Sequence, residues 1–328
     1  MNIITSEIRT LAAAPVGRGR PEGPKINAAD QKNALSPRAL NCPSSHWRIL
    51  RNRNERGKMS LFHYTSAAGL QGIIETKSIW ATDHRFLNDP SEFTHGWAIV
   101  IAALKRRKAE LDQISTEVWH SIEALREHSE RGGVFAFVGS LTSEGDLLSQ
   151  WRGYGGGRGF AIGFNEDWLL QNAAAQGFDI HPVVYDPPDQ QRAAEDVVAL
   201  LLKLLSEKPT MFLTDVMQQW WKHALKVALV LKDKNFNEER ESRLVWIGLG
   251  WPPELRTRFT GAGIVPYLSC KLDKVLINVP QHPNNIGIEE IIVGPALGRQ
   301  QLAAVDALQH RNGMRTIVRK SVIPFIAD

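Results

Sequence analysis

The stretch Leu61-Phe62-His63-Tyr64-Thr65 decides how the chain begins to fold. Its apolar and aromatic residues predict a short strand, and the apolar positions of residues 70–79 have the spacing of one helical face. His63 is therefore expected on a strand that runs directly into a helix. A second polar segment, Phe236 to Arg243 (FNEERESR), lies far downstream, and we expect it to meet His63 in one cleft.

The composition is that of a soluble globular protein. The chain has 328 residues, of which 43% are hydrophobic and 23% charged, so it can bury a sizeable core. Its two cysteines, Cys42 and Cys270, form no CxxC pattern, which argues against a disulfide framework and a structural zinc site and fits a reducing cytoplasm. No apolar run approaches the roughly 18 residues of a membrane span, so we expect no membrane association.

The basic charge of the chain is concentrated at its N-terminal end. Residues 1–58 contain 11 Lys and Arg against 4 Asp and Glu, whereas the remaining residues contain 28 against 31. The first segment lacks periodic apolar positions, and we expect a disordered basic tail rather than a nucleic-acid-binding domain. Codons for residues 55–58 can form a purine-rich ribosome-binding sequence, so Met59 is a candidate for the true start.

From Met59 onward, the pattern predicts a single α+β domain over residues 59–328. Two long helical insertions are expected at Phe93 to Glu130 and at Ala193 to Leu231. The almost wholly apolar segment Val134 to Thr142 predicts a buried strand. No phosphate-binding glycine motif of a doubly wound sheet is present. We therefore predict two small, mostly antiparallel sheets that form a split core.

Residues 88–92 (NDPSE) have the pattern of a helix start. Asp89 is a suitable N-cap, Pro90 suits the first helical position, and Glu92 suits the first turn. Capping explains Asp89 and Glu92 better than metal ligation does. Asn88 lies just before the cap and is a candidate to face the cleft.

Two aromatic residues, Trp151 and Tyr154, flank the glycine-rich turn of residues 153–159. Each can pack against the sheet, or the pair can hold a flat ring between them. The glycines match neither a dinucleotide-binding fingerprint nor a Walker loop. The choice between packing and stacking stays open at this point.

Glu239, Glu241 and Arg243 alternate on a segment that leads into a predicted strand, so all three are expected on one side. Ionisable side chains beside the apolar residues 244–247 are costly to bury unless they are paired or used in chemistry. The alternative is an exposed edge strand on which Arg243 simply pairs with Glu241.

Taken together, these motifs resemble the bacterial domain-of-unknown-function family numbered 2971, over about Leu61 to Pro324. More distantly, the order of a His strand, an aromatic and a late Glu-x-Glu strand is similar to the ADP-ribosyltransferase superfamily. The segments that carry the first resemblance are His63-Tyr64-Thr65, residues 87–92, Ser143 with Trp151 and Tyr154, Phe236 with Glu239, Glu241 and Arg243, and Ile292-Val293-Gly294-Pro295.

The second resemblance implies an ADP-ribosyltransferase-like split core and an NAD-consuming transferase or glycohydrolase, of the kind that serves as a bacterial toxin or defence effector, with a protein or nucleic-acid acceptor. Glu241 would stabilise the oxocarbenium-like centre, Glu239 would orient or deprotonate the acceptor, and His63 would bind the adenosine ribose. Trp151 or Tyr154 would stack on nicotinamide. The residues implied to bind NAD are His63, Tyr64, Thr65, Asn88, Trp151, Tyr154 and Arg243. The chain has no clear Ser-Thr-Ser element, only Leu141-Thr142-Ser143.

Two other classes of function stay open. One is a metal-dependent hydrolase or nuclease that uses His63, Asp89, Glu92 and the Glu239–Glu241 pair, although no His-x-His or His-Glu-x-x-His spacing is present. The other is a non-catalytic binding module on the same fold.

Overall fold

A computed structural model describes residues 60–87, 89, 91–114, 116–130, 134–153, 158–207, 213–261, 263–275 and 286–324. The predicted basic tail of residues 1–58 lies outside these ranges, as do Asn88, Pro90 and Tyr154. No helix in the described ranges is long and apolar enough to cross a membrane.

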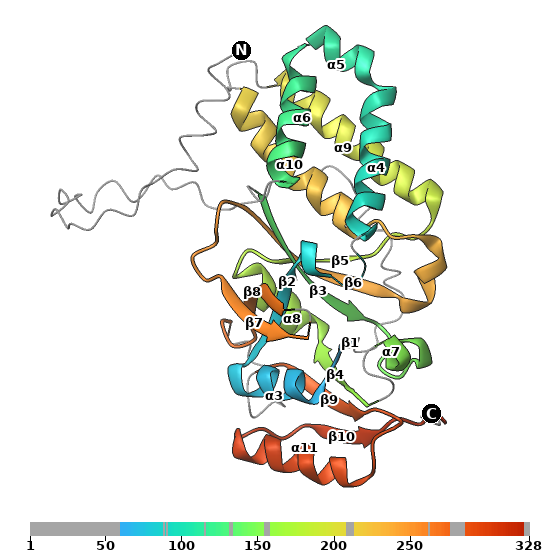
Figure 1. The fold of residues 1–328 in the computed structure, drawn as a ribbon, viewed down its shortest axis with the longest axis vertical. Coiled ribbons are helices and arrows are strands. Elements are labelled where there is room, and N and C mark those ends of the chain that lie inside the picture. The colour runs from blue at the N-terminus through green and yellow to red at the C-terminus, as the bar shows by residue number, and fades with distance from the viewer. Residues whose placement is uncertain are drawn as a thin grey trace, which may run out of the picture. The chain divides into compact units, whose positions relative to one another are not determined.

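The chain is an α+β protein whose strands join in one open sheet (Figure 1). All strand pairs of this sheet are antiparallel except the parallel pair of β9 and β10. The strands run in the order β10-β9-β4-β1-β3-β2-β8-β7, with β6 on β3 and β5 on β6. Their bounds are β1 Ser60–Thr65, β2 Ser78–Asp83, β3 Val134–Thr142, β4 Phe160–Asn165, β5 Asp179–Pro182, β6 Glu241–Leu249, β7 Arg256–Thr260, β8 Gly263–Lys271, β9 Ile288–Val293 and β10 Ile317–Lys320.

The sheet forks at β3. β6 pairs with β3 along all nine residues of both strands. β1 joins β3 at Thr142, opposite Phe62, whereas β2 joins it at Val138 and Phe137. Because β6 occupies one edge of β3 completely, β1 and β2 must share the other edge and diverge from it. The prediction of two small sheets is corrected in this respect: the core is split by a fork within a single ten-stranded sheet.

The helices form separate groups on the sheet (Figure 1). α4, α9 and α10 contact one another, α10 contacts β6, and α6 contacts β3, while α3 and α8 contact the other branches of the sheet. The described helices are α3 Ala67–Thr76, α4 Ser91–Arg106, α5 Lys108–Ile114, α6 Glu117–Glu130, α7 Leu148–Gly153, α8 Glu166–Ala174, α9 Pro187–Glu207, α10 Leu213–Val230 and α11 Gln300–Arg311, with the 3-10 helices η2 His84–Phe86 and η3 Lys234–Glu239.

β3 is apolar over residues 134–138 and at Leu141 because both of its faces are covered. Phe135, Phe137 and Leu141 belong to the large core that includes α3 and α8. Ala136 and Val138, which point to the other face, pack in a smaller core with α10. Successive side chains of a strand alternate between faces, so the sequence prediction of a buried strand at Val134 to Thr142 is confirmed.

The two predicted helical insertions are present, each divided into shorter helices. The first is formed by α4, α5 and α6, and the second by α9 and α10. β5 ends at Pro182. Beyond this strand, Val184 makes a parallel bridge to Leu231, and its backbone N–H donates to the carbonyl of Val230. This bridge fixes the chain that follows α10, which carries part of the site described below.

The close contact of α4 with α10 depends on Gly96. A Cβ atom at Gly96 would lie 2.0 Å from the backbone oxygen of Ala228 on α10. We expect Gly96→Ala to lower the free energy of unfolding by about 1–3 kcal/mol, because the helices must separate to admit the methyl group. Urea unfolding of the two proteins measures this difference.

Gly153→Ala is the matched control, since a Cβ atom there would meet nothing within 4 Å. This change should be neutral or slightly stabilising, as Ala has the higher helix propensity by about 1 kcal/mol. Equal stability of Gly96→Ala and the wild type would show that α4 and α10 do not pack as described.

Candidate active site: a buried cluster of carboxylates and cations

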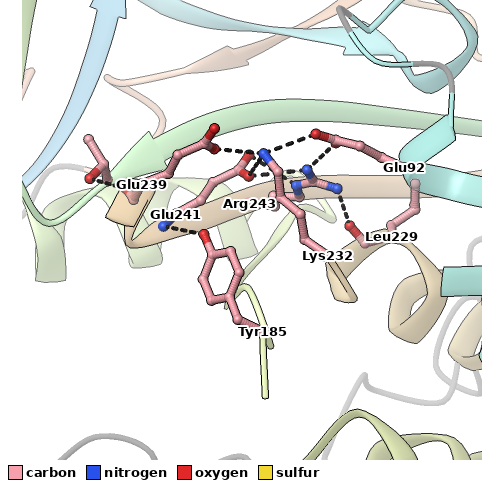
Figure 2. Close-up of polar contacts among 8 residues, drawn as sticks. Glu92, Tyr185, Leu229, Lys232, Glu239, Glu241 and Arg243 are labelled. Atoms are coloured by element: carbon pink, nitrogen blue, oxygen red, sulfur yellow. Dashed lines mark hydrogen bonds and ion pairs between the residues drawn. The ribbon is translucent and has the colours of Figure 1, made fainter. Parts of the chain in front are cut away.

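Five charged side chains meet where the start of α4, the chain after α10 and the start of β6 come together (Figure 2). Three are carboxylates and two are cations, so the group has one net negative charge when all are ionised. We call this group, formed by Glu92, Lys232, Glu239, Glu241 and Arg243, the carboxylate–cation cluster.

Lys232 is the member that contacts every carboxylate. Its Nζ lies 2.9 Å from Glu92 Oε1, 2.6 Å from Glu239 Oε2 and 3.1 Å from Glu241 Oε2. The side chain is buried, and Nζ also lies 5.0 Å from the ring centroid of Phe236. An ammonium group has three N–H donors, so one donor is available for each carboxylate.

Arg243 binds Glu241 through two nitrogens. Its Nε donates to Glu241 Oε1 at 3.0 Å and its Nη2 to Glu241 Oε2 at 3.1 Å. Nη2 also donates to Glu92 on α4, and Nη1 donates to the backbone carbonyl of Leu229 on α10. The planar guanidinium suits this forked geometry, and it ties β6 to two helices at once.

Glu239 and Glu241 reach Lys232 from different backbone conformations. The sequence predicted both on one strand, but Glu239 ends η3 and Glu241 begins β6. Arg240 between them is in the left-handed region, with φ 43° and ψ 45°. This region costs a non-glycine residue about 1–2 kcal/mol. The strained turn at Arg240 is what brings the two carboxylates to one ammonium group.

Hydroxyl groups complete the surroundings of the two glutamates. Thr142 lies opposite Glu241 in the β3–β6 register, and its Oγ1 donates to the backbone carbonyl of Glu239 at 2.7 Å. The side chain of Ser140, on the same face of β3, is among the groups that lower the pKa of Glu241. The hydroxyl of Tyr185 accepts from the backbone N–H of Glu241 at 3.0 Å (Figure 2).

The two glutamates of the Glu-x-Glu pair differ in their acidity. Burial alone would raise the pKa of Glu241, but the charges of Arg243 and Lys232 outweigh burial and hold that pKa below its ordinary value. Burial raises the pKa of Glu239 above its ordinary value, and the hydrogen bond from Lys232 does not fully offset this. Glu239 lacks an arginine partner, and its side chain is 25% exposed against 6% for Glu241. Glu239 is therefore the member best placed to take up a proton from solvent.

The structure changes the interpretation of two residues. Glu92, assigned from sequence to helix capping, extends instead to Lys232 and Arg243. Arg243 does pair with Glu241, as the alternative to catalysis supposed, but the pair is buried and β6 lies between β3 and β5, so it is not an exposed edge ladder. Arg243 has no free face in this arrangement for the NAD contact that was expected of it.

The strand register does not bring His63 to the Glu239–Glu241 pair. Phe62, Thr142 and Glu241 lie opposite one another across three strands, so they share a face of the sheet. His63, adjacent to Phe62, points to the other face, as does Leu61 in the large core. Its Nδ1 lies 2.8 Å from the carbonyl oxygen of Ser140, in the fork between β1 and β2.

His63 is uncharged at neutral pH. Burial lowers the pKa of its imidazole, the hydrogen bond to Ser140 only partly opposes this, and the positive charge of Arg258 lowers the pKa further. Because the Ser140 carbonyl can only accept, Nδ1 carries the proton of the neutral ring and Nε2 is left as an acceptor.

Two other residues implied to bind NAD, Tyr64 and Trp151, have partners within the chain. Tyr64 is buried, and its hydroxyl donates to the carbonyl of Glu144 and accepts from the N–H of Leu147. Trp151 is 0% exposed, stacks edge-on against Tyr64 at 4.7 Å and donates to Asp146 at 2.7 Å. Trp151 therefore has no free ring face for nicotinamide.

Three further residues were implied to bind NAD, namely Thr65, Asn88 and Tyr154. Thr65 is the last residue of β1 and lies opposite Phe160 of β4. The helix α3 begins two residues later, at Ala67. Asn88 and Tyr154 lie outside the described residues. Phe236, which is 40% exposed, belongs to the same helix η3 as Glu239, and Lys232 Nζ lies over its ring.

The metal-dependent alternative gains no ligand set from the described ranges. No group of three or more His, Cys, Asp or Glu side chains suited to a metal ion occurs there. The three carboxylates of the cluster do converge, but on an ammonium and a guanidinium group, which already provide their positive partners.

Sequence reasoning missed Lys232, Ser140 and Tyr185. Lys232 directly follows the buried apolar run of residues 227–231, and a lysine at the end of such a run needs a partner. Ser140 and Thr142 are hydroxyl residues two apart in an otherwise apolar strand, which was a signal that one face of β3 meets polar groups. No local pattern singled out Tyr185.

Comparison with known families agrees with the first resemblance. The family model described as "Protein of unknown function (DUF2971)" matches residues 150–244. This range contains Lys232, Glu239, Glu241 and Arg243, whereas Glu92 and Ser140 lie outside it. Comparisons with curated proteins and with solved structures found no match.

The buried pairing of Glu241 predicts a large effect on stability. Glu241→Gln removes a charge from between two buried cations, and we expect a loss of about 3–5 kcal/mol in the free energy of unfolding. Glu144→Gln is the control, because Glu144 pairs with Arg240 in an exposed ion pair that should contribute about 0–1 kcal/mol. Urea unfolding of both variants measures the contrast, and equal losses would exclude the buried network.

Glu239 also predicts how stability depends on pH. Its folded pKa is raised, so its contribution to stability is full below its unfolded pKa of about 4.3 and is lost as pH rises through the folded pKa. Glu241 acts oppositely: its contribution is present above the unfolded value and is lost as pH falls through its lowered folded pKa. The free energy of unfolding of Glu239→Gln should therefore rise relative to that of the wild type as pH rises from about 4 to 7.

Unfolding by urea at several pH values checks this dependence. Glu238→Gln, a change at the exposed neighbouring residue, should give a curve parallel to the wild type. A parallel curve for Glu239→Gln as well would contradict a raised pKa at Glu239.

Proposed function

We propose that this chain is an enzyme that breaks the nicotinamide–ribose bond of NAD, as an ADP-ribosyltransferase or an NAD glycohydrolase, with Glu239 as its catalytic carboxylate. The observation that carries the proposal is the asymmetry of the Glu-x-Glu pair. Glu241 is buried and bound to two cations, whereas Glu239 is partly exposed and has a raised pKa. Paired carboxylates with opposite shifts are typical of divided roles in acid–base chemistry.

Glu239 would act on both partners of the reaction. As the glycosidic bond breaks, its electron pair moves to the pyridinium ring, which leaves as neutral nicotinamide, and positive charge develops on the ribose. The excess negative charge of the cluster favours that centre. The acceptor hydroxyl, or water, then attacks the ribose carbon and gives its proton to Glu239, a general base whose raised pKa suits proton transfer.

Other members of the site would position these groups. Glu241 has both oxygens engaged by Arg243 and Lys232, so it holds the cations in place rather than contacting substrate. Phe236, on the same helix η3 as Glu239 and 40% exposed, would offer a flat apolar surface to the nicotinamide ring. The roles implied for His63 and Trp151 are not part of the proposal, since one faces the other side of the sheet and the other is buried.

A second candidate is a non-catalytic module in which the cluster only holds the fold together. The observation that favours it is the pairing of every carboxylate in the cluster with a cation. It differs from the first candidate in what it predicts for Glu239, whose removal should then affect stability without abolishing any reaction.

The test is release of nicotinamide from NAD by the purified chain. Glu239→Gln keeps the size of the side chain but removes the base, and we expect the rate to fall by about 10²–10⁴ while the midpoint of thermal unfolding changes little. Chromatography of the released nicotinamide measures the rate.

Glu238→Gln controls for the loss of one negative charge from the same exposed turn and should keep full activity. The proposal fails if the wild type releases no nicotinamide with water or with added acceptors, or if Glu239→Gln is as active as the wild type.

A further inference from the structure

Arg258 on the edge strand β7 is held between two aromatic rings. Its guanidinium carbon lies 5.7 Å from the ring centroid of Trp80 on β2 and 5.6 Å from that of Tyr267 on β8. Its Nη2 donates to Thr82 Oγ1 at 2.8 Å. We call the group of Arg258, Thr82, Trp80 and Tyr267 the Arg258 site.

Arg258 is a partly buried arginine with no carboxylate partner in the described ranges. The other described arginines that are buried or partly buried are each paired with a carboxylate: Arg107 with Glu110, Arg126 with Glu123, Arg243 with Glu92 and Glu241, and Arg319 with Glu290. None of the described carboxylates pairs with Arg258. Burial lowers its pKa, which the Tyr267 hydroxyl opposes only weakly.

The cation–π contacts position Arg258 but supply no negative charge. Arg258 is partly buried, which disfavours its charged form, and no carboxylate of the described ranges offsets this. An anionic group from outside the chain would supply the missing partner.

The donors of the site suit a phosphate group. A guanidinium has five N–H donors in a planar fork, and one is used on Thr82. The forked geometry binds two oxygens of a phosphate at once.

We propose that Arg258, with the hydroxyl of Thr82 beside it, binds a phosphate group of a ligand at the fork of the sheet. The proposal stands apart from the NAD chemistry, because it rests on β2, β7 and β8 and none of the five residues of the carboxylate–cation cluster. The phosphate can belong to free inorganic phosphate or pyrophosphate, or to a nucleotide.

Calorimetric titration of the full chain tests the proposal, with inorganic phosphate, pyrophosphate and AMP as probes at constant ionic strength. We expect at least one probe to bind, and Arg258→Gln to weaken that binding by about tenfold or more, as for loss of a charge-assisted contact. Thr82→Val should weaken it by a smaller factor. Binding of AMP but neither inorganic probe would identify a nucleotide as the source.

Arg256→Gln is the matched control, since it removes the same charge from an exposed position on the same strand and should change the affinity by less than about threefold. Glu239→Gln should bind the probe as well as the wild type, so failure of the NAD proposal leaves this one intact. If no probe binds the wild type, or if Arg258→Gln and Arg256→Gln weaken binding equally, the proposal is wrong.

A second measurement covers the case in which Arg258→Gln does not fold. Phenylglyoxal modifies accessible arginines, and peptide mass spectrometry of the wild type reports the modification of Arg258 and Arg256 separately. A binding phosphate probe should protect Arg258 at least several-fold and leave Arg256 unprotected. Equal protection of both arginines, or of neither, would overturn the assignment.

Discussion

The ion pairs of Lys232 and Arg243 with three glutamates are the interaction on which the arrangement of this chain depends. Glu92 and Arg243 are 151 residues apart in the sequence, yet each cation is compensated only when α4, the end of α10 and the start of β6 are all in place. A buried charge without its partner costs several kcal/mol. Partly assembled states, with one of these elements displaced, are therefore penalised strongly, and the helices are held in one orientation on β3 and β6.

The fork of the sheet follows from the same strand. β3 gives one complete edge to β6, so β1 and β2 must share the other edge and separate at residues 139–141. Backbone groups left without a strand partner need another one. The His63 side chain supplies it for the carbonyl of Ser140. This contact gives His63 a structural function at the fork.

Periodicity predicted the elements well where they are long and local. Val134 to Thr142 and the two helical insertions have strong apolar patterns, so their positions follow from the sequence. β2 and β7 were missed, since β2 follows α3 after one residue and β7 alternates Arg and Thr with little apolar signal. The Glu-x-Glu pair was recognised as unusual. Its cationic partner Lys232 was not recognised, nor was the pairing of Glu92 with Lys232 and Arg243, because no local pattern states which distant residues will neutralise a buried charge.

The composition of the cluster decides which carboxylate can take part in chemistry. Three carboxylates face two cations, so one negative charge is not fully compensated. It cannot reside mainly on Glu241, which Arg243 binds with two nitrogens and which Lys232 also contacts. Glu92 shares both cations. In the described ranges, the carboxylate of Glu239 pairs with Lys232 alone. Its side chain is 25% exposed, and its pKa is raised. The uncompensated negative charge therefore resides mainly on Glu239. The pairing of the other four residues holds this carboxylate in position to meet a developing positive charge or to accept a proton.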